Sequence, residues 1–353
     1  MRLIKYARLF RKIHEHKRRN KFILPYRLEV SLTYACNSRC RICRIWDIYR
    51  KNPELTKKEL RLEEWNKLFR YMDKNLYMLA LTGGEPFLRS DIDRLIGSAA
   101  ANCRNLMLVV IATNGLMPEV IHKKVKRILK QIPKDINLIV TISLDGPPDV
   151  NNMLRGVKDS FENSRKTYSF LKNLKKRYKN LEVIREITIS QHNIRYIPGM
   201  MKALNRQKVR HNYTFAFNCE YFRNNEIKME NENIRKIIRL IKKQKIAHAS
   251  IFHRIIERRF LNLADKYYSS YHKQVVPCYS SWATVFIDPY GNVQPCINEP
   301  ISLGNIKEHG FELKKVLSTE TARKVRHDIK KGRCLGCWTP CEAYTTIMQN
   351  MSI

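Results

Sequence analysis

Ten cysteines make this chain unusual, because eight of them fall into two clusters near its two ends. The first cluster comprises Cys36, Cys40 and Cys43, and the second comprises Cys278, Cys296, Cys334, Cys337 and Cys341. Closely spaced thiols in a reducing compartment are typical of ligands to a metal or an iron-sulfur cluster rather than of disulfides. The other two, Cys103 and Cys219, fit the ordinary pattern of single buried cysteines in a core.

The first cluster lies on one short loop, in the pattern Cys-x3-Cys-x2-Cys directly after a predicted strand. Three thiolates can hold three corner irons of a 4Fe-4S cluster, so the fourth iron stays open to a small chelating molecule. A tetrahedral zinc ion would need a fourth ligand, and neither His nor Cys follows at a fitting distance before Cys103. Zinc is the alternative for this loop.

Further short motifs follow later predicted strands. They are Gly83-Gly84-Glu85-Pro86, Thr113-Asn114-Gly115, and Ser143-Leu144-Asp145-Gly146-Pro147 with Leu154-Arg155-Gly156 after it. Each is weak alone, since two glycines and a Glu signify only a turn. In this order, after the cysteine loop, they resemble the motifs of the radical S-adenosylmethionine (SAM) superfamily, over residues 27–220 of the chain.

The resemblance implies roles for particular residues. The three thiolates of the first loop hold a 4Fe-4S cluster, and SAM binds at its open iron. The implied SAM pocket is lined by Ile42, Gly83, Gly84, Glu85, Pro86, Asn114, Ser143, Asp145 and Arg155. In it the glycine-rich backbone receives the methionine amino group, Ser143 faces the ribose and Arg155 the carboxylate. Ile42 departs from the aromatic residue that is frequent in the family, and it implies weaker stacking on the adenine.

The second cluster has longer spacings, Cys278-x12-Gly291-x4-Cys296 and then Cys334-x2-Cys337-x3-Cys341. It resembles the auxiliary-cluster region of the SPASM and twitch groups of radical SAM enzymes. A full SPASM pattern has seven motif cysteines for two clusters, whereas five are present here, so one auxiliary 4Fe-4S cluster is expected. The implied ligands are Cys278, Cys296, Cys334 and Cys337, with Cys341 either replacing one of them or lying free beside the cluster. A structural zinc site is the alternative.

These residues need a scaffold that brings the ends of several strands together. Short β-branched runs alternate with longer amphipathic stretches, which predicts repeated βα units around a parallel sheet. Six strands are expected, at residues 27–33, 77–82, 106–113, 138–144, 183–190 and 213–218. Loops at the carboxyl ends of parallel strands converge on one mouth in a barrel-like sheet. The expected fold class is α/β, a partial (βα)6 TIM-like barrel with a C-terminal twitch/SPASM-like cluster domain.

The pattern divides the chain into four units. They are a basic amphipathic N-terminal arm, the radical SAM barrel, a helical connector and the auxiliary cluster domain, at residues 1–26, 27–222, 223–272 and 273–353 respectively. In the last unit, the turn Asp288-Pro289-Tyr290-Gly291 between two apolar runs predicts a β-hairpin with cysteines at its ends.

The resemblance also implies a mechanism. An electron, from a donor such as ferredoxin or flavodoxin, passes through the first cluster into SAM, and a 5'-deoxyadenosyl radical then abstracts hydrogen from the substrate. A fully ligated auxiliary cluster cannot bind substrate through iron, so its expected role is electron transfer in a net oxidation. Cys219 and Glu220 follow the sixth strand at the substrate end, where they are candidates for a hydrogen-atom donor and a base. The alternative is a buried or idle pair.

The chain carries 67 Lys and Arg against 32 Asp and Glu, a formal charge of +35. Such a charge attracts anionic lipid, nucleic acid or a phosphorylated substrate, although a general bias toward Lys gives the same excess with no partner. The N-terminal arm suits a membrane interface, or it packs on the barrel and covers its open side. Nucleic acid is not favoured, because no aromatic-basic binding motif is present.

Two further observations bear on location and substrate. The longest apolar run, Leu106 to Ala112, has seven residues, whereas a membrane-spanning helix needs roughly 20. Without a secretory signal pattern, we expect a cytoplasmic protein, with peripheral membrane contact as the alternative location. Many SPASM-type enzymes modify ribosomally made peptides, but the 35 residues before Cys36 are too few for a fused peptide-binding domain.

The sequence therefore predicts a radical SAM enzyme that acts on an unidentified anionic or membrane-associated substrate. A SPASM-type maturase that modifies a peptide or protein is the alternative within the enzyme class. A non-catalytic metal-binding protein associated with nucleic acid is the alternative from another class. The Gly83-Gly84-Glu85-Pro86 segment argues against that one, since a merely structural cluster has no need of a SAM pocket.

Overall fold

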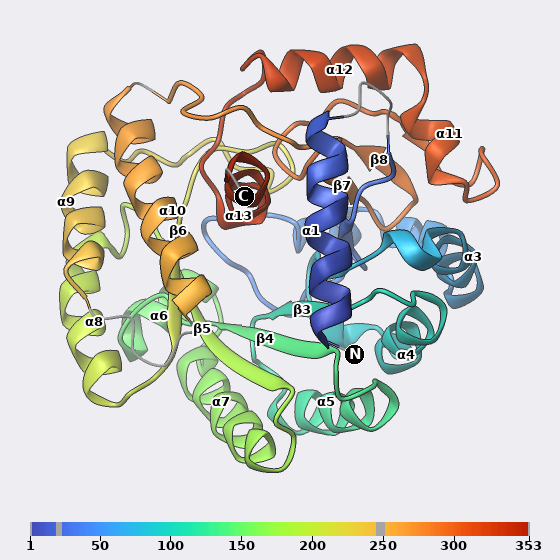
Figure 1. The fold of residues 1–353 in the computed structure, drawn as a ribbon. Coiled ribbons are helices and arrows are strands. Elements are labelled where there is room, and N and C mark those ends of the chain that lie inside the picture. Colours follow the sequence, from blue (N-terminus) through green and yellow to red (C-terminus); the bar gives the residue numbers. More distant parts are fainter. Residues whose placement is uncertain (1, 19–22, 245–250, 271, 352–353) are drawn as a thin grey trace.

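The computed structural model describes residues 2–18, 23–244, 251–270 and 272–351. Within them the chain forms a nine-stranded sheet in the order β6-β5-β4-β3-β2-β1-β7-β8-β9 (Figure 1). The first six strands, all parallel to their neighbours, are β1 Arg27–Ser31, β2 Met78–Thr82, β3 Leu108–Thr113, β4 Asn137–Ser143, β5 Leu181–Ile189 and β6 His211–Phe215. Each corresponds to a predicted strand, and the α/β fold class is confirmed.

The segments between these strands form the helices α2 Asp47–Lys51, α3 Leu62–Met72, α4 Ile92–Asn102, α5 Pro118–Gln131, α6 Pro148–Arg155, α7 Ser160–Arg177 and α8 Ile197–Arg206, with short 3-10 helices η1 Pro53–Lys58, η2 Asp73–Asn75, η3 Pro86–Leu88 and η4 Ile194–Tyr196. Of these, α3, α4, α5 and α7 lie along the outer face of the sheet (Figure 1). Alternation along β4 explains the layering, since Leu138, Val140 and Ile142 are fully buried in one core with apolar residues of α5. The opposite face of the strand, with Thr141 and Ser143, turns toward the barrel interior and is half-buried.

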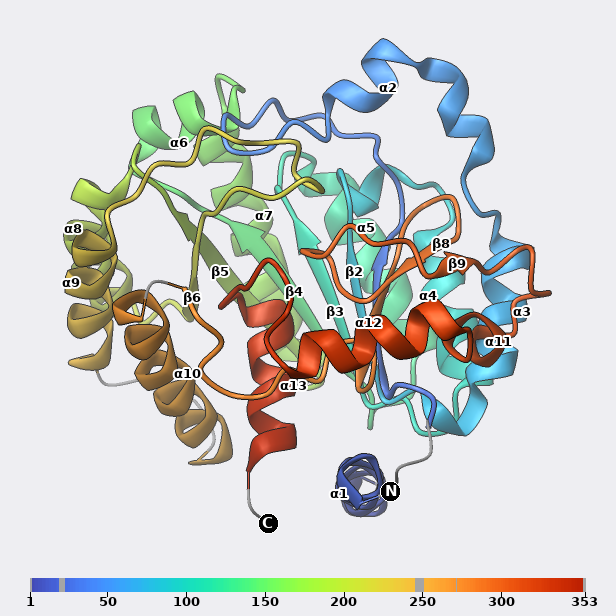
Figure 2. The ribbon, with the colours of Figure 1, turned by 90° about the horizontal axis from the view of Figure 1, so that it is seen from above.

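Helix α1, Arg2–Arg18, closes the amino end of the barrel. Its Leu9 and Ile13 are buried against Tyr26, Tyr77 and Met107, which directly precede β1, β2 and β3. Figure 2 shows α1 end-on, on the opposite side of the molecule from α2. Two roles were predicted for the arm, and in the structure the helix packs on the barrel. Residues 1 and 19–22 of the arm lie outside the described residues.

The predicted connector is helical, as α9 Asn231–Lys242 and α10 Ile251–Ser269. The buried face of α9 consists of Ile234, Ile237, Ile238 and Ile241. These side chains share a core with β6 and α10, so the connector packs on the far edge of the barrel sheet. Residues 245–250 and 271 of the connector lie outside the described residues. No helix among the described residues is long and apolar enough to cross a bilayer.

The C-terminal region contains β7 Thr284–Ile287, β8 Asn292–Gln294, β9 Gly304–Asn305, α11 Leu313–Leu317, α12 Glu320–Lys330 and α13 Pro340–Asn350. The predicted hairpin exists as β7 and β8. Its first strand also pairs in parallel with β1, with Leu28 opposite Val285, so the hairpin extends the barrel sheet. All four residues of β7 are buried, as in strands that are covered on both faces.

Candidate functional site

The first cysteine loop lies at the carboxyl ends of the strands, directly after β1. Backbone hydrogen bonds join it to two later segments, from Gly84 N to Thr33 O at 2.7 Å and from Arg39 N to Arg155 O at 2.9 Å. Gly83 has a φ of +122°, and a Cβ on it would stand 2.3 Å from Thr33 O. Only glycine fits so close to the loop, so the glycine-rich segment fixes its path.

Three polar groups point at the thiols of this loop. Ser38 Oγ lies 3.1 Å from Cys40 Sγ, Arg155 Nη1 lies 3.6 Å from the same sulfur, and Asn114 Nδ2 lies 3.9 Å from Cys36 Sγ. Burial raises the pKa of Cys36 and of Cys43 to about 12, so binding of iron must displace a proton from each thiol. The N–H donors of Arg155 and Asn114 at the sulfurs favour the thiolates that an iron-sulfur cluster needs.

Arg155 is held by a buried ion pair with Asp145. Its Nη2 lies 2.5 Å from Asp145 Oδ2, and the other carboxylate oxygen accepts a hydrogen bond from Thr188 N at 2.9 Å. Burial alone would lower the pKa of Arg155, but Asp145 and Cys40 outweigh it, and the pKa lies above its ordinary value. Arg155 is therefore a fixed cation beside the cysteine loop, and Asp145 orients it.

Glu85 is fully buried and connects two of the predicted pocket segments. Its carboxylate accepts hydrogen bonds from Phe87 N at 3.1 Å, Thr113 Oγ1 at 2.8 Å and Asn114 N at 2.8 Å. Burial raises its pKa to about 7 in spite of these bonds. Glu85 thus joins the glycine-rich segment to the Thr113-Asn114 segment, and Pro86, also buried, begins the short helix η3.

The remaining predicted pocket residues lie where the strand ends place them. Ser143 is the last residue of β4 and is half-buried. Ile42 is also half-buried, and its carbonyl accepts a hydrogen bond from Asn224 Nδ2 at 2.6 Å. Their contacts with SAM stay predictions, as do those of the glycine-rich backbone.

Cys219 and Glu220, the candidate hydrogen donor and base, point in different directions. Cys219 is 4% exposed, and its thiol lies 3.6 Å from Ile297 O and 3.9 Å from Asn298 Oδ1. Glu220 is exposed. The structure thus brings Cys219 against the segment that follows Cys296, between the two cysteine sites, and does not bring Glu220 to either.

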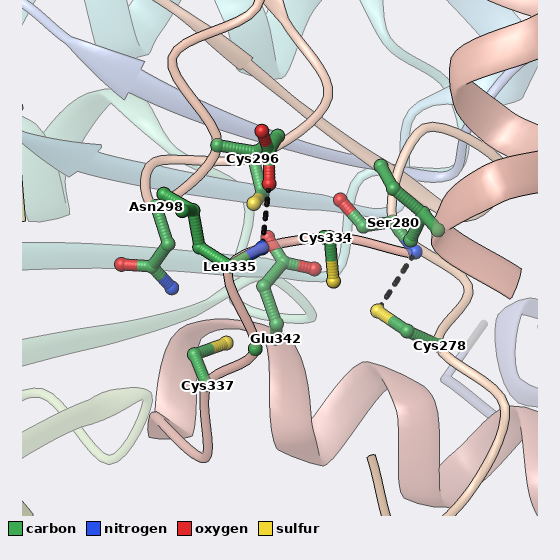
Figure 3. Close-up of a pocket in the computed structure, with 11 residues that line it drawn as sticks. Cys278, Ser280, Cys296, Asn298, Cys334, Leu335, Cys337 and Glu342 are labelled. Atoms are coloured by element: carbon green, nitrogen blue, oxygen red, sulfur yellow. Dashed lines mark hydrogen bonds between the residues drawn. The ribbon is translucent and has the colours of Figure 1, made fainter. Parts of the chain in front are cut away.

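Four of the C-terminal cysteines line one small pocket. They are Cys278, Cys296, Cys334 and Cys337, and the other lining residues are Ser280, Asn298, Glu299, Ile329, Leu335, Gly336 and Glu342 (Figure 3). The thiols come from the loop before β7, the turn after β8 and the loop between α12 and α13. Burial raises the pKa of all four, to about 12 for Cys337. The predicted auxiliary ligands are thus brought together, and their ligand role stays a prediction.

Cys341, the ambiguous fifth cysteine, lies outside this pocket. Its thiol is buried beside Glu29, and its backbone carbonyl accepts a hydrogen bond from Arg27. Of the two positions predicted for Cys341, this arrangement favours the one in which it lies free beside the cluster.

The zinc alternatives can be compared with the arrangement of side chains. Among the residues that the structure describes, no three His, Cys, Asp or Glu side chains gather closely enough for a single metal ion. A 4Fe-4S cluster is wider than one ion and needs ligands at its four corners. The four-cysteine pocket, with thiols from three segments, fits such a corner arrangement.

Several polar residues near the sulfurs were missed from sequence, among them Ser38 and Glu342. Ser38 lies inside the Cys-x3-Cys spacing, and its hydroxyl also donates to Arg155 O at 2.8 Å. Glu342 lines the auxiliary pocket. The one signal for it is the pattern Thr339-Pro340-Cys341-Glu342, which resembles a helix capping box.

Two sequence models of known families match the chain. The model of the radical SAM superfamily matches residues 30–202, and that of the SPASM iron-sulfur cluster-binding domain matches residues 278–338. The antilisterial bacteriocin subtilosin biosynthesis protein AlbA of Bacillus subtilis is 25% identical over 339 residues, which is 90% of this chain and 68% of AlbA.

Other relatives match over shorter stretches. The Fe-coproporphyrin III synthase of Methanosarcina barkeri is 28% identical over 51% of this chain and 41% of its own length. The sporulation killing factor maturation protein SkfB of Bacillus subtilis is 28% identical over 48% of this chain and 37% of its own length. Among solved structures, anSMEcpe with bound AdoMet has a TM-score of 0.61 at 15% identity, covering 92% of this chain and 95% of the other, which shows a shared fold.

Proposed function

Because the chain belongs to the radical SAM superfamily and carries a SPASM-type iron-sulfur domain, we propose that it is an enzyme that modifies a peptide. Its cofactors are SAM, a 4Fe-4S cluster and an auxiliary iron-sulfur cluster. The proposal of a peptide substrate rests on the similarity to AlbA, a bacteriocin biosynthesis protein, because this similarity extends over 90% of the chain. A peptide, the alternative in the sequence analysis, thereby becomes the first candidate.

The shorter matches support this order of candidates. SkfB, a maturation protein, adds a second relative of the same kind. The GTP 3',8-cyclase of Stenotrophomonas maltophilia matches only 26% of this chain and 27% of its own length. A match of that length shows a shared part of the fold rather than a shared substrate class.

The residues of the first loop would hold the SAM-binding cluster through Cys36, Cys40 and Cys43. When bound, the cluster and SAM supply a radical able to take hydrogen from an unreactive carbon. Arg155 places an N–H donor beside Cys40, and Asp145 keeps the guanidinium turned toward the loop. Ser38 joins the loop to the Arg155 segment, because its hydroxyl donates to Arg155 O. The same cation is the group that we assign to the SAM carboxylate, while Ser143 is assigned to the ribose.

The charge of the chain refines the substrate class. With a formal charge of +35, the protein favours an anionic partner, so the peptide we propose is rich in Asp and Glu. The residues of the auxiliary pocket would hold a cluster that supplies a one-electron acceptor. With one hydrogen atom taken by the radical, one electron passed to that acceptor and one proton released to solvent, the proposed reaction is a net two-electron oxidation of the peptide. We assign delivery of electrons to a ferredoxin or flavodoxin, and we expect the membrane to be at most a surface that the protein touches.

The test uses the anaerobically purified full-length protein with dithionite, SAM and synthetic peptides of equal length, one set acidic and one basic. We expect acidic peptides to raise 5'-deoxyadenosine formation above the rate without peptide and to lose two hydrogen atoms, as seen by mass spectrometry. Stimulation by anionic vesicles or nucleotides, with no response to any peptide, would overturn the peptide assignment and leave the enzyme class intact. Absence of any SAM cleavage from a fully loaded protein would overturn both.

A further inference from the structure

A buried carboxyl group shares the auxiliary pocket with the four cysteines. Glu342 is 2% exposed, and both of its carboxylate oxygens lack a hydrogen-bond partner among the described residues. In Figure 3 its side chain points into the pocket among the labelled cysteines. A buried carboxyl group without partners costs several kcal/mol, so a position of this kind calls for a ligand.

The residues before Glu342 have the order of a helix capping box. Thr339 to Glu342 begin α13 in the order of a capping box, in which the Glu side chain would reach back to the backbone of Thr339. The structure has no such bond, since Thr339 makes no side-chain cap and its hydroxyl instead accepts from Asn298 Nδ2 at 3.3 Å. Thr339 thus contacts Asn298 of the pocket lining, and Glu342 itself lines the pocket. Neither side chain caps α13.

The nearby cation does not satisfy this carboxylate. Burial raises the pKa of Glu342 to about 8, and the charge of Arg27 only partly opposes this rise. The guanidinium of Arg27 is already bonded to the carbonyl of Cys341 and to Thr345 Oγ1 at 3.1 Å. It also faces Glu29 at 3.7 Å. Glu342 is therefore attracted electrostatically by Arg27 but accepts no hydrogen bond from it.

The four thiols differ in how far their chain segments lie from solvent. Cys334 is flanked on both sides by exposed residues, Arg333 and Leu335. Each of the other three cysteines, Cys278, Cys296 and Cys337, has at least one buried neighbour in the chain. Cys334 is therefore the thiol whose segment lies nearest to solvent.

The pocket therefore presents four thiols and one carboxylate without a hydrogen-bond partner, that of Glu342, to a cluster that has four corners. We propose that Glu342 is an oxygen ligand of the auxiliary cluster, that Cys278, Cys296 and Cys337 supply the three thiolates, and that Cys334 is the thiol left outside. A carboxylate is a harder donor than a thiolate, but iron accepts oxygen, nitrogen and sulfur ligands. This replaces the all-cysteine set expected from the spacing, and it rests on the auxiliary cluster alone rather than on the peptide substrate.

The test isolates the auxiliary cluster in the full-length chain. Cys36→Ser, Cys40→Ser and Cys43→Ser together remove the first cluster, and the auxiliary site is then loaded anaerobically with isotopically enriched iron and sulfide. Mössbauer spectra should show about one quarter of the iron as a subsite distinct from the thiolate-bound rest. In that background Glu342→Gln should abolish the distinct subsite or lower the iron content, because the amide is a poor ligand.

A matched control and a second variant complete the test. Glu299 lines the same pocket, but its Oε2 already accepts a hydrogen bond from Leu335 N at 3.1 Å, so Glu299→Gln should leave the spectrum unchanged. Cys334→Ser should keep about four irons per chain. Four equivalent irons with an unchanged spectrum in Glu342→Gln, or loss of iron in Cys334→Ser, would overturn the proposal. Because no SAM is added, these outcomes are independent of the proposed function.

Discussion

The two cysteine sites differ in how their ligands are gathered and in the charges that surround them. The first has three cysteines on one loop after β1, with the cation of Arg155 3.6 Å from Cys40. The second gathers Cys278, Cys296, Cys334 and Cys337 from three separate segments, and the charged side chains in its lining are the carboxylates of Glu299 and Glu342.

This difference predicts different duties. A local loop needs only a strand end and a few backbone bonds to be formed before the cofactor arrives, so its cluster can be exchanged at little cost to the fold. A site made from distant segments depends on the whole C-terminal region, and a cluster bound there links those segments as a cross-link does. The carboxylates of Glu299 and Glu342 also oppose the addition of an electron to a cluster in this pocket. We therefore expect the auxiliary cluster to have a lower reduction potential than the cluster of the first loop.

The largest expected effect comes from Cys40→Ala. It removes the thiolate beside Arg155 and should lower 5'-deoxyadenosine formation below detection, because SAM cleavage depends on the cluster of this loop. Chromatography after reduction with dithionite measures it. Cys103→Ala, a buried cysteine at the amino end of β3, serves as the control and should still cleave SAM. Cleavage at the normal rate in Cys40→Ala would contradict the assignment of the loop.

Next in size is the effect of Cys296→Ala on stability. Loss of this ligand should reduce the iron content from about eight to about four per chain. It should also lower the apparent Tm by roughly 4 °C or more, since three segments are no longer cross-linked. Scanning calorimetry under nitrogen compares it with Cys40→Ala, for which we expect a smaller shift. Equal shifts in the two variants would remove the distinction between a local and a distributed site.

Asp145→Asn should weaken SAM binding by about 10- to 100-fold. The change leaves Arg155 without its partner in a buried setting, and breaking such a pair costs about 3–5 kcal/mol, part of which appears as instability. Equilibrium binding of SAM and thermal unfolding both report on it. Asp149→Asn, an exposed carboxylate of α6, is the control, and an equal loss in that variant would show that charge in general is responsible.

A further effect, confined to a range of pH, should appear in the pH dependence of stability through Glu85. Its pKa is about 7 in the folded protein, above the ordinary value of 4.5, so the folded state holds the proton more tightly than the unfolded state. This contribution to stability is complete below the unfolded pKa and is lost as the pH rises through about 7, up to about 3 kcal/mol in all.

Glu85→Gln should remove this pH-dependent part. Chemical denaturation at pH values of about 5 and 8 should therefore show a smaller stability difference in the variant than in the parent. The exposed Glu119→Gln on α5 should keep the parental pH dependence. A variant at Glu85 that follows the parent curve would show that this carboxyl does not titrate as its burial indicates.

The first site was largely predictable from sequence, because its ligands and motifs lie within a few residues of strand ends. The alternation of apolar runs located β1 to β6, and the loops after them carried the cysteine, glycine-rich and Asn114 segments. Sequence did not show that Asp145 orients Arg155 or that the Glu85 carboxylate accepts hydrogen bonds from Thr113 and Asn114, since both depend on the side of a turn from which a carboxylate leaves the chain.

The second site was predictable only in its cysteines. Their convergence was expected, but the distinct position of Cys341 depends on the direction in which α13 begins. The pairing of β7 with β1 was also not expected, because a hairpin of apolar residues fits either an independent domain or an open sheet edge. The pattern at Thr339 to Glu342 favoured a helix cap, and the structure has none there.

The pairing of β7 with β1 has a consequence for how the chain is made. Until residues 284–287 leave the ribosome, β1 has no partner on that side, and Leu28 and Val30, fully buried in the finished protein, lie in an open edge strand. Such edges template β pairing with neighbouring chains, and folding intermediates that expose them are prone to aggregate. The C-terminal region therefore also protects the barrel from self-association, and a fragment that ends before residue 284 should accumulate as insoluble protein.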